Sequence, residues 1–262
     1  MDLGLTNRTT LVTGSYRGTG AGIARVFAAE GAEVLVHGFE SDQGADVVAG
    51  IVADGGRARL VTGDLMTDEG AQAVIDAAGP VEVLVNNYGL AGRGTWKSEA
   101  DQWFDAWNRN VVSGVRMVHG VVPGMRERGW GRVIFVGTVG SARPGDRMPH
   151  YYSAKSALPG LVVSLARDLG GSGITANLVS PGLIATAEVQ ERFMRMGAEK
   201  GWGTTWDEVA PRALAEFMPS PTTRIPDPED VGRVVAFVAG HPGWPINGAN
   251  VRVDGGAAAT PN

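Results

Sequence analysis

Short apolar segments alternate with amphipathic segments along the chain. The apolar segments have the length of buried strands, and they cover Thr9–Thr13, Val34–His37, Ala58–Thr62, Val81–Asn86, Arg132–Val136, Ile174–Val179 and Ala249–Val253. Apolar residues at helical spacing stand between them, at Ala21–Ala29, Val47–Ala53, Glu69–Ala78, Ala100–Arg128, Tyr151–Gly170 and Pro228–Ala239. This alternation predicts a single α/β domain over residues 1–262, a Rossmann-type doubly wound fold with helices on both faces of a seven-stranded parallel sheet.

Two of the predicted helices are expected to be irregular. The helix over residues 100–128 is expected to be interrupted near Asn110. Pro159 follows Lys155 by four residues and has no N–H for the Lys155 carbonyl. We therefore expect a bend just past that lysine.

Residues 183–226 break the alternation, because the two amphipathic stretches Glu188–Met196 and Trp206–Phe217 have no strand between them. Two interpretations stay open. The helices pack their own apolar face, or they form a lid over a mainly apolar substrate, since ligands bind beyond the carboxyl ends of such strands. The substrate pocket is expected to be shaped by Arg93–Trp96, Ser141–Pro149 and Leu183–Phe217.

Composition excludes several classes of function. The 262-residue chain has a net charge of −5, which leaves no basic footprint for a nucleic acid or an anionic membrane. It has no cysteine, hence no thiolate metal site, and we predict no bound metal. No apolar run approaches the roughly 20 residues needed to span a bilayer, and Met1–Gly4 begins no signal segment. We expect a cytoplasmic protein whose partner is a small molecule.

Tyr151 and Lys155 form the clearest candidate for chemistry. They are four residues apart on a predicted helix, so they project from the same face. The ammonium should favour the phenolate and lower the tyrosine pKa from about 10. Such a tyrosine can donate a proton to a carbonyl oxygen or take one from an alcohol.

A glycine-rich turn stands between the first strand and the first helix. Gly14, Gly18 and Gly20 let the backbone approach a phosphate closely, and the helix N-terminus offers unpaired N–H groups. The spacing of these three glycines differs from the G-x-G-x-x-G fingerprint. The position favours a dinucleotide pyrophosphate.

The chain carries an ordered set of motifs: Thr13–Gly14-x-x-x-Gly18-x-Gly20, Asn86–Asn87–Tyr88–Gly89, Tyr151-x-x-x-Lys155, Pro181–Gly182 and Val253–Asp254–Gly255–Gly256. This set resembles the short-chain dehydrogenase/reductase family, most of all its 3-oxoacyl-carrier-protein reductase group. The resemblance covers essentially the whole chain and implies an oxidoreductase that uses NAD(P)(H). Family members are commonly tetramers, so we expect a homotetramer by analogy.

The resemblance also implies where the cofactor lies. The pyrophosphate is expected at the glycine turn, the adenine beside Asp64–Leu65, and the nicotinamide near Asn86–Gly89 and 181–186. The implied cofactor-binding residues are Gly14, Ser15, Arg17, Gly18, Thr19, Gly20, Gly38, Phe39, Asp64, Leu65, Asn87, Tyr88, Gly89, Tyr151, Lys155, Pro181, Gly182, Ile184 and Thr186. Structural alternatives are that Asp64 caps the next helix, Asn86 braces the sheet and Pro181–Gly182 is only a turn.

The choice of nicotinamide turns on the end of the second strand. In the family, NAD-users place an acid there for the ribose, and NADP-users place a cation nearby for the 2′-phosphate. Gly38 and Phe39 carry neither marker, whereas Arg17 matches a position that often faces the phosphate. We therefore favour NADP(H); NAD(H) stays possible, with Glu40 on the ribose.

The implied catalytic residues are Asn110, Thr138, Tyr151 and Lys155. Thr138 stands thirteen residues before Tyr151, where the family has a serine, and keeps the hydroxyl while adding a methyl; Ser141 is a nearby substitute. Asn110 is expected to hold a water that relays protons to Lys155, with Asn108 as the alternative register.

Three functions follow. The first is hydride transfer between NADP(H) and a carbonyl or secondary alcohol of a mainly apolar or acyl substrate, with Tyr151 as the general acid/base. The second is an NAD-dependent alcohol or polyol dehydrogenase. The third is a nicotinamide-binding sensor or scaffold, which stays open because Thr138 and Tyr88 depart from the family pattern. The Tyr88 ring either narrows the site or turns outward.

Overall fold

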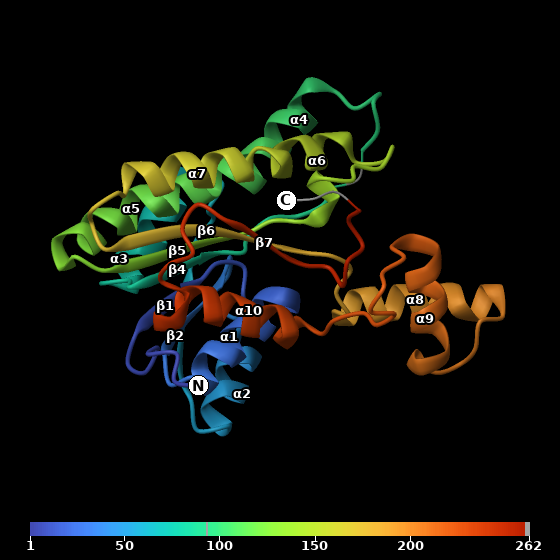
Figure 1. The fold of residues 1–262 in the computed structure, drawn as a ribbon, viewed down its shortest axis with the longest axis horizontal. Helices are drawn as coiled ribbons and strands as arrows, with labels where there is room; N and C mark the ends of the chain where they lie inside the picture. The colour runs from blue at the N-terminus through green and yellow to red at the C-terminus, as the bar shows by residue number, and fades with distance from the viewer. Residues whose placement is uncertain (93, 260–262) are drawn as a thin grey trace.

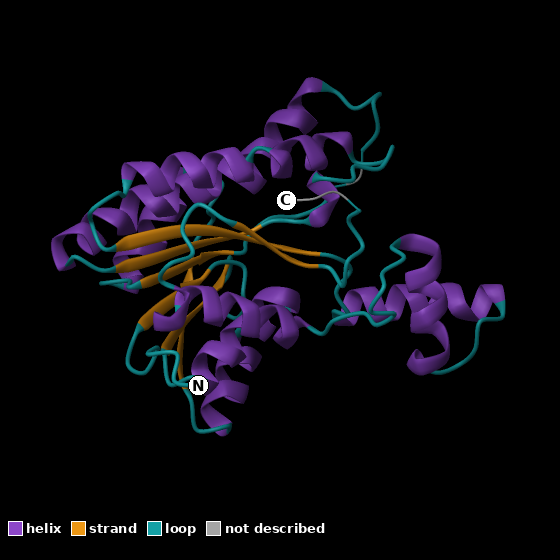
Figure 2. Ribbon diagram, viewed as in Figure 1, coloured by secondary structure: helices purple, strands orange, loops and turns teal. Residues whose placement is uncertain are grey.

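Seven parallel strands form one sheet in a computed structural model that describes residues 1–92 and 94–259. Figures 1 and 2 show the strands between two layers of helices, and their order is β3-β2-β1-β4-β5-β6-β7. The predicted fold class is confirmed. Arg93, expected near the substrate, lies outside the described residues. The strands are β1 Thr9–Val12, β2 Glu33–Gly38, β3 Arg57–Thr62, β4 Val83–Asn86, β5 Gly131–Val136, β6 Ile174–Pro181 and β7 Asn250–Val253.

Alternating side chains divide the interior into two cores. On β4, Val83 and Val85 face one core and Leu84 faces the other, as the two-residue period of a strand requires. Both faces are apolar because helices cover both. The first core lies under α1 Gly18–Ala29, α2 Ala45–Ala53 and α10 Pro228–Ala239, and the second under α3 Asp68–Ala78, α5 Ser113–Arg128 and α7 Leu158–Asp168.

The two irregular helices break near the positions that the sequence indicates. The predicted helix over 100–128 is α4 Ala100–Trp107, a π-helical turn η1 Asn108–Val112, and α5. The predicted helix over 151–170 is two helices, α6 Pro149–Ser156 and α7, separated at Ala157. Pro159 falls in the first turn of α7, where its missing N–H costs no bond. The single helix over 151–170 was therefore wrong: where a bend was expected past Lys155, the chain breaks into two helices.

A helical lobe projects beyond the carboxyl end of the sheet (Figure 1). It consists of α8 Ala187–Lys200 and α9 Trp206–Phe217, which pack around Phe193, Val209 and Ala213. Trp202, Trp206 and Met196 cover this small core from its edges. The helices therefore pack their own apolar face, which is compatible with the lid as well, and the lid stays a prediction.

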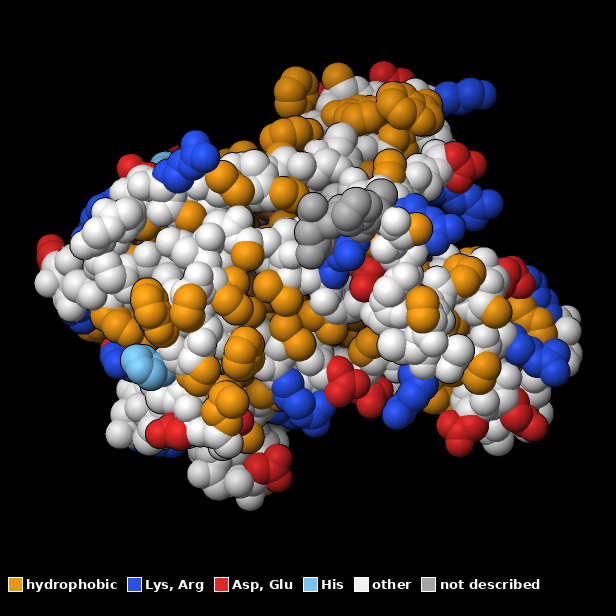
Figure 3. Space-filling model, viewed as in Figure 1, with side chains coloured by type: hydrophobic (Ala, Val, Ile, Leu, Met, Phe, Trp, Pro, Cys, Tyr) orange, Lys and Arg blue, Asp and Glu red, His pale blue; other side chains and the backbone are white. Residues whose placement is uncertain are grey.

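Apolar side chains also gather on the surface over α4 (Figure 3). Trp96 and Phe104 are 76% and 73% exposed there. Within residues 1–92 and 94–259, no helix has both the length and the apolar character to cross a bilayer.

Candidate active site

The carboxyl ends of β1, β4, β5 and β6 border a cleft made of two adjoining pockets. Its larger part, the glycine-loop pocket, has a volume of ≈ 500 Å³; the smaller part, the tyrosine pocket, ≈ 180 Å³. Thr19, Asn87 and Gly89 line both parts. The glycine-loop pocket is also lined by Gly14, Tyr16, Arg17, Gly18, Gly20, Phe39, Tyr88, Leu90, Arg109 and Glu188, and the tyrosine pocket by Val136, Gly137, Thr138, Tyr151, Lys155, Pro181, Gly182 and Ile184. Folding thus brings the separate motifs together.

The glycine turn has the form of an anion site. Helix α1 begins at Gly18, and no side chain caps its first N–H groups. These N–H groups and the positive end of the helix dipole border the glycine-loop pocket. Thr19 and Gly20 lie in the same first turn. The residues present fit a dinucleotide pyrophosphate.

The Ser15 side chain does not reach this pocket, contrary to the prediction. It is fully buried, donates to the Val12 carbonyl at 2.7 Å, and accepts from the His37 N–H at 2.9 Å. His37 Nδ1 in turn accepts from the Gly14 N–H at 2.9 Å. Burial lowers the His37 pKa to about 4, so the ring stays neutral and its Nε2 donates to Gly63 O. Ser15 and His37 therefore support the glycine turn from beneath.

Asp64 and Leu65, both predicted beside the adenine, differ in the exposure of their side chains. The Leu65 side chain is 1% exposed and belongs to the core, so only its backbone is available. Asp64 is exposed and accepts from the Met66 N–H at 2.9 Å, while Thr67 caps the helix that follows. The helix-capping alternative for Asp64 was therefore wrong, since Asp64 supports the preceding turn.

Gly38 ends β2 where no side chain fits. A Cβ there would lie 2.4 Å from the Gln43 carbonyl oxygen. Phe39 follows it into the glycine-loop pocket, and Gln43 Oε1 accepts from the Phe39 N–H at 3.0 Å. The loop after β2 thus closes the position where an acid would bind a ribose.

The segment after β4 is tied to the glycine turn. Asn87 Nδ2 donates to the carbonyls of Thr13 at 2.9 Å and Gly14 at 3.2 Å. The Tyr88 ring lies against Phe39, with centroids 5.2 Å apart, and narrows the glycine-loop pocket. Burial raises the Tyr88 pKa to about 12. Asn86 is buried and points back toward α5, as the bracing alternative expected.

Thr138, Tyr151 and Lys155 converge on the tyrosine pocket. Tyr151 and Thr138 share a side-chain hydrogen bond, and Lys155 Nζ donates to the Val136 carbonyl at 2.9 Å. Ser141 cannot replace Thr138, because its hydroxyl donates to the Thr138 carbonyl at 2.7 Å. The thirteen-residue spacing thus brings together two hydroxyls that can contact one oxygen atom.

The predicted lowering of the Tyr151 pKa was wrong for this structure. Burial raises the pKa of Tyr151 to about 12, and the bond to Thr138 offsets only part of this. Burial also lowers the pKa of Lys155 to about 8. The lysine is engaged with Val136 and does not set the tyrosine pKa. A tyrosine with a raised pKa holds its proton at neutral pH.

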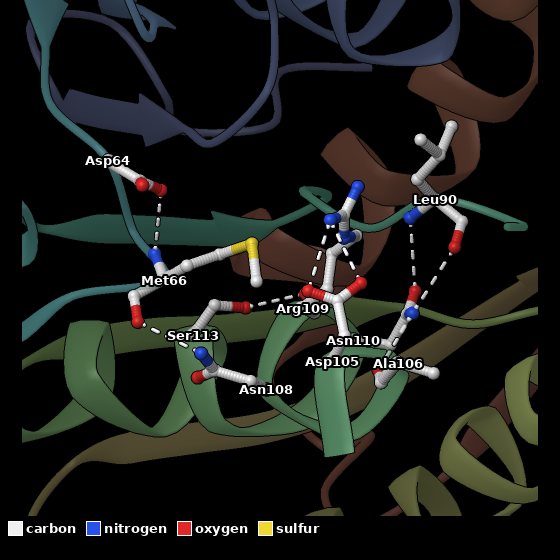
Figure 4. A network of polar contacts seen from close by, with 9 residues as sticks. All are labelled: Asp64, Met66, Leu90, Asp105, Ala106, Asn108, Arg109, Asn110 and Ser113. Atoms are coloured by element: carbon white, nitrogen blue, oxygen red, sulfur yellow. Dashed lines mark hydrogen bonds and ion pairs between the residues drawn. The ribbon is translucent and has the colours of Figure 1, made fainter. Parts of the chain in front are cut away.

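Asn110 anchors the segment after β4 from the π-helical turn (Figure 4). Its Oδ1 accepts from the Leu90 N–H at 3.1 Å, and its Nδ2 donates to the carbonyls of Leu90 and Ala106. Asn108 points elsewhere, toward Met66. A Cβ on Gly89 would lie 2.6 Å from Asn110 Oδ1 and 3.0 Å from Lys155 Nζ, so these two groups flank the glycine. The water-holding role of Asn110 stays a prediction.

The segment after β6 closes the cleft. The Gly182 N–H donates to Val253 O at 3.0 Å, and Ile184 lines the tyrosine pocket. Thr186 caps α8 through the Val189 N–H at 3.4 Å, and its side chain packs beside Gly18. The turn alternative for Pro181–Gly182 is compatible with this position, because the same turn forms the wall.

Sequence reasoning missed two charged residues of the cleft. Arg109 and Glu188 both line the glycine-loop pocket. Glu188 Oε1 lies 3.5 Å from Arg17 Nη1, and Arg109 pairs with Asp105 at 3.0 Å. No motif marks either residue. The neighbouring Asn110 was the only signal for Arg109.

Comparison with known proteins agrees with this geometry. Residues 8–196 match the family model of the short chain dehydrogenases. The chain is 33% identical over 260 residues to YvaG, an uncharacterized oxidoreductase of Bacillus subtilis, covering 98% of each chain. It is 30% identical over 257 residues to the 3-oxoacyl-[acyl-carrier-protein] reductase FabG of Vibrio cholerae, covering 97% of this chain and 98% of the relative.

A solved structure shares the whole fold. L-sorbose reductase from Gluconobacter frateurii, crystallised with NADPH and L-sorbose, superimposes with a TM-score of 0.92 at 28% identity and full coverage of both chains. The sheet order, the convergent Tyr151 and Lys155, and these matches lead to one conclusion. The chain belongs to the short-chain dehydrogenase/reductase family and is an NAD(P)-dependent oxidoreductase.

Proposed function

We propose that the protein transfers hydride between NADP(H) and a carbonyl or secondary alcohol, with Tyr151 as the general acid/base. One observation carries the proposal: Tyr151, Thr138 and Lys155 line a pocket that shares Thr19, Asn87 and Gly89 with the glycine-loop pocket. A reacting oxygen placed there meets two hydroxyls, and a dinucleotide bound along the cleft ends beside it.

The protonated Tyr151 phenol can supply the proton that carbonyl reduction needs. A phenol with a pKa of about 12 is protonated at neutral pH and is ready to donate to a carbonyl oxygen. Thr138 orients that oxygen, and Lys155, one helical turn from Tyr151, lines the same pocket beside it. NADP(H) supplies or accepts the hydride when bound.

Several features support NADP(H) over NAD(H). Arg17 lines the glycine-loop pocket, and the closed end of β2 has no room for the acid that would bind a free ribose. The structurally similar L-sorbose reductase was crystallised with NADPH. The cofactor would be held by the α1 N-terminus, Asn87 and Lys155.

Two substrate classes deserve testing. An acyl ketone is the first candidate, because FabG of Vibrio cholerae acts on 3-oxoacyl chains. A ketose is the second, because a sorbose reductase matches the fold over its full length. The apolar side chains of the lobe give little support to an apolar site, since Phe193 and its neighbours fill the lobe's own core.

The test begins with the binding of NADPH and of NADH, each measured by nicotinamide fluorescence. Turnover is then measured on a panel of 3-oxoacyl thioesters and ketoses, with Tyr151→Phe and Tyr152→Phe as a matched pair. We expect Tyr151→Phe to lose turnover and keep cofactor binding, and Tyr152→Phe to keep most of both. Equal activity of Tyr151→Phe and the wild type would refute the proposal and favour a sensor or scaffold.

We also propose a homotetramer. A groove of ≈ 560 Å³ runs between α5 and α7 and is lined mainly by apolar side chains, including Val118, Val122, Leu161 and Leu165. Burial of this face against another copy would remove apolar surface from water. Light scattering should give the mass of a tetramer, and Leu161→Asp should give smaller species. A monomeric wild type would contradict the assembly.

A further inference from the structure

The helix that carries Tyr151 begins without a side-chain cap. Helix α6 has eight residues, Pro149 is its first residue, and Met148 precedes it as the N-cap. So short a helix has little stability of its own, and no side chain caps its first turn. The position of Tyr151 therefore depends on what the start of α6 contacts.

Met148 has a strained backbone. Its φ of 60° and ψ of 45° lie in the left-handed region, which is uncommon for residues other than glycine, and the proline that follows restricts it further. Such a conformation persists only where the surroundings fix it. The Met148 N–H donates to the Gly94 carbonyl at 3.0 Å. Its carbonyl accepts from the N–H groups of Tyr151 and Tyr152, both at 3.1 Å. One residue thus joins the segment after β4 to the backbone of Tyr151.

The His150 side chain makes a second contact with the same segment. It is 3% exposed, and its ring lies edge to face against Trp103 of the neighbouring α4, with centroids 6.1 Å apart (Figure 1). A Cβ on Gly94 would lie 2.2 Å from His150 Cε1, so the ring packs directly on that glycine. The His150 Nδ1 is buried and has no hydrogen-bond partner in the described part of the chain. The ring therefore acts here through its shape.

The segment after β4 also borders the cleft. Gly89 and Leu90 line the glycine-loop pocket, and Gly89 lines the tyrosine pocket as well. Asn110 holds both backbone groups of Leu90, at 3.1 and 3.3 Å. The near end of the segment is thus fixed to the cleft, and Gly94 contacts the start of α6.

We propose that Met148 and His150 are positioning residues, which place the Tyr151 hydroxyl for proton transfer by fixing the start of α6 against the segment after β4. The inference rests on the proposed function, because it concerns the same tyrosine. Neither side chain is among the described residues that line the two pockets, so each acts through Tyr151. Misplacement of a reacting group by about 1 Å can lower a rate about a hundredfold. Loosening either contact should therefore slow turnover and leave cofactor binding intact.

Met148→Gly tests the strained residue. Glycine adopts a positive φ readily, so the variant should keep the wild-type midpoint of urea unfolding while the start of α6 becomes less constrained. Turnover is measured with NADPH and acetoacetyl-coenzyme A or L-sorbose, whichever the wild type reduces. We expect kcat to fall about tenfold and the NADPH dissociation constant to change less than about twofold. Asn7→Gly is the matched control and should keep kcat, because Asn7 also has a positive φ, of 62°, and lies outside both pockets.

A second pair of variants tests His150. His150→Ala removes the ring, and His150→Leu restores much of its volume without a ring nitrogen. We expect kcat to fall about tenfold in His150→Ala and less than about threefold in His150→Leu, because packing requires shape alone. An equal loss in both variants would overturn the positioning role of His150, since its nitrogens would then take part in the chemistry.

Other outcomes would also contradict the inference. A wild-type kcat in Met148→Gly or in His150→Ala would overturn the role of that residue. A loss of kcat in Met148→Gly that comes with an equal loss of NADPH binding, or with a lower unfolding midpoint, would show that Met148 only holds the fold. Turnover that survives Tyr151→Phe, or a wild type that reduces neither ketone, would instead overturn the proposed function.

Discussion

The buried charge of Lys155 should make the stability of the cofactor-free protein depend on pH. Burial lowers the pKa of Lys155 from 10.5 to about 8. Between these two values the unfolded chain holds one more proton than the folded protein, so the free energy of unfolding rises with pH. Each pKa unit corresponds to about 1.4 kcal/mol. From pH 7 to pH 10 the wild type should gain about 2–3 kcal/mol relative to Lys155→Met.

Urea unfolding followed by circular dichroism measures this difference. The protein concentration is held constant across pH 7, 8, 9 and 10, because assembly also adds stability. The bond from Lys155 to Val136 O is lost in the variant at every pH, so it shifts the curve without changing its slope. Lys97→Met removes an exposed lysine and should run parallel to the wild type. Parallel curves for Lys155→Met, within about 0.5 kcal/mol, would refute the reasoning.

Three further predictions follow from close contacts in the cleft. Gly89→Ala puts a methyl 3.0 Å from Lys155 Nζ. The overpacking should lower the free energy of unfolding by about 1–3 kcal/mol and should lower kcat. Gly50→Ala, whose methyl would have nothing within 4 Å, should be neutral or stabilising in the same unfolding assay. Thr138→Ser should retain turnover and Thr138→Val should lose about a hundredfold or more; equal rates would exclude a role for the hydroxyl. Ser15→Ala leaves two buried backbone groups unpaired and should lower the free energy of unfolding by about 1–3 kcal/mol in denaturant titration; an unchanged midpoint would contradict its supporting role.

Much of the fold was predictable because its signals are local. The strand at Arg132–Val136 and the glycine turn at Gly14 follow from residues close in sequence. The break past Lys155 follows from Pro159 in the same way. The π-helical form of the interruption at Asn110 did not, and the side chain there bonds Leu90, a residue distant in sequence.

In the candidate site, too, the local signals were predictable and the contacts between distant residues were not. The ordered motifs indicate which residues reach the cleft, because the carboxyl ends of parallel strands share one edge of the sheet. Ser15 lay within the right motif, yet its hydroxyl is taken by Val12 and His37. The Tyr151 pKa also went against the prediction, because burial outweighs a lysine that is turned toward Val136.

By itself, the sequence determined the alternation of strands and helices, the family and the set of candidate catalytic groups. Tertiary structure decided which of these groups are free to act. It paired Arg17 with Glu188 and Arg109 with Asp105, and it buried Phe193 in the core of the lobe. Such outcomes depend on burial and on contacts between distant residues, and neither is encoded in local periodicity.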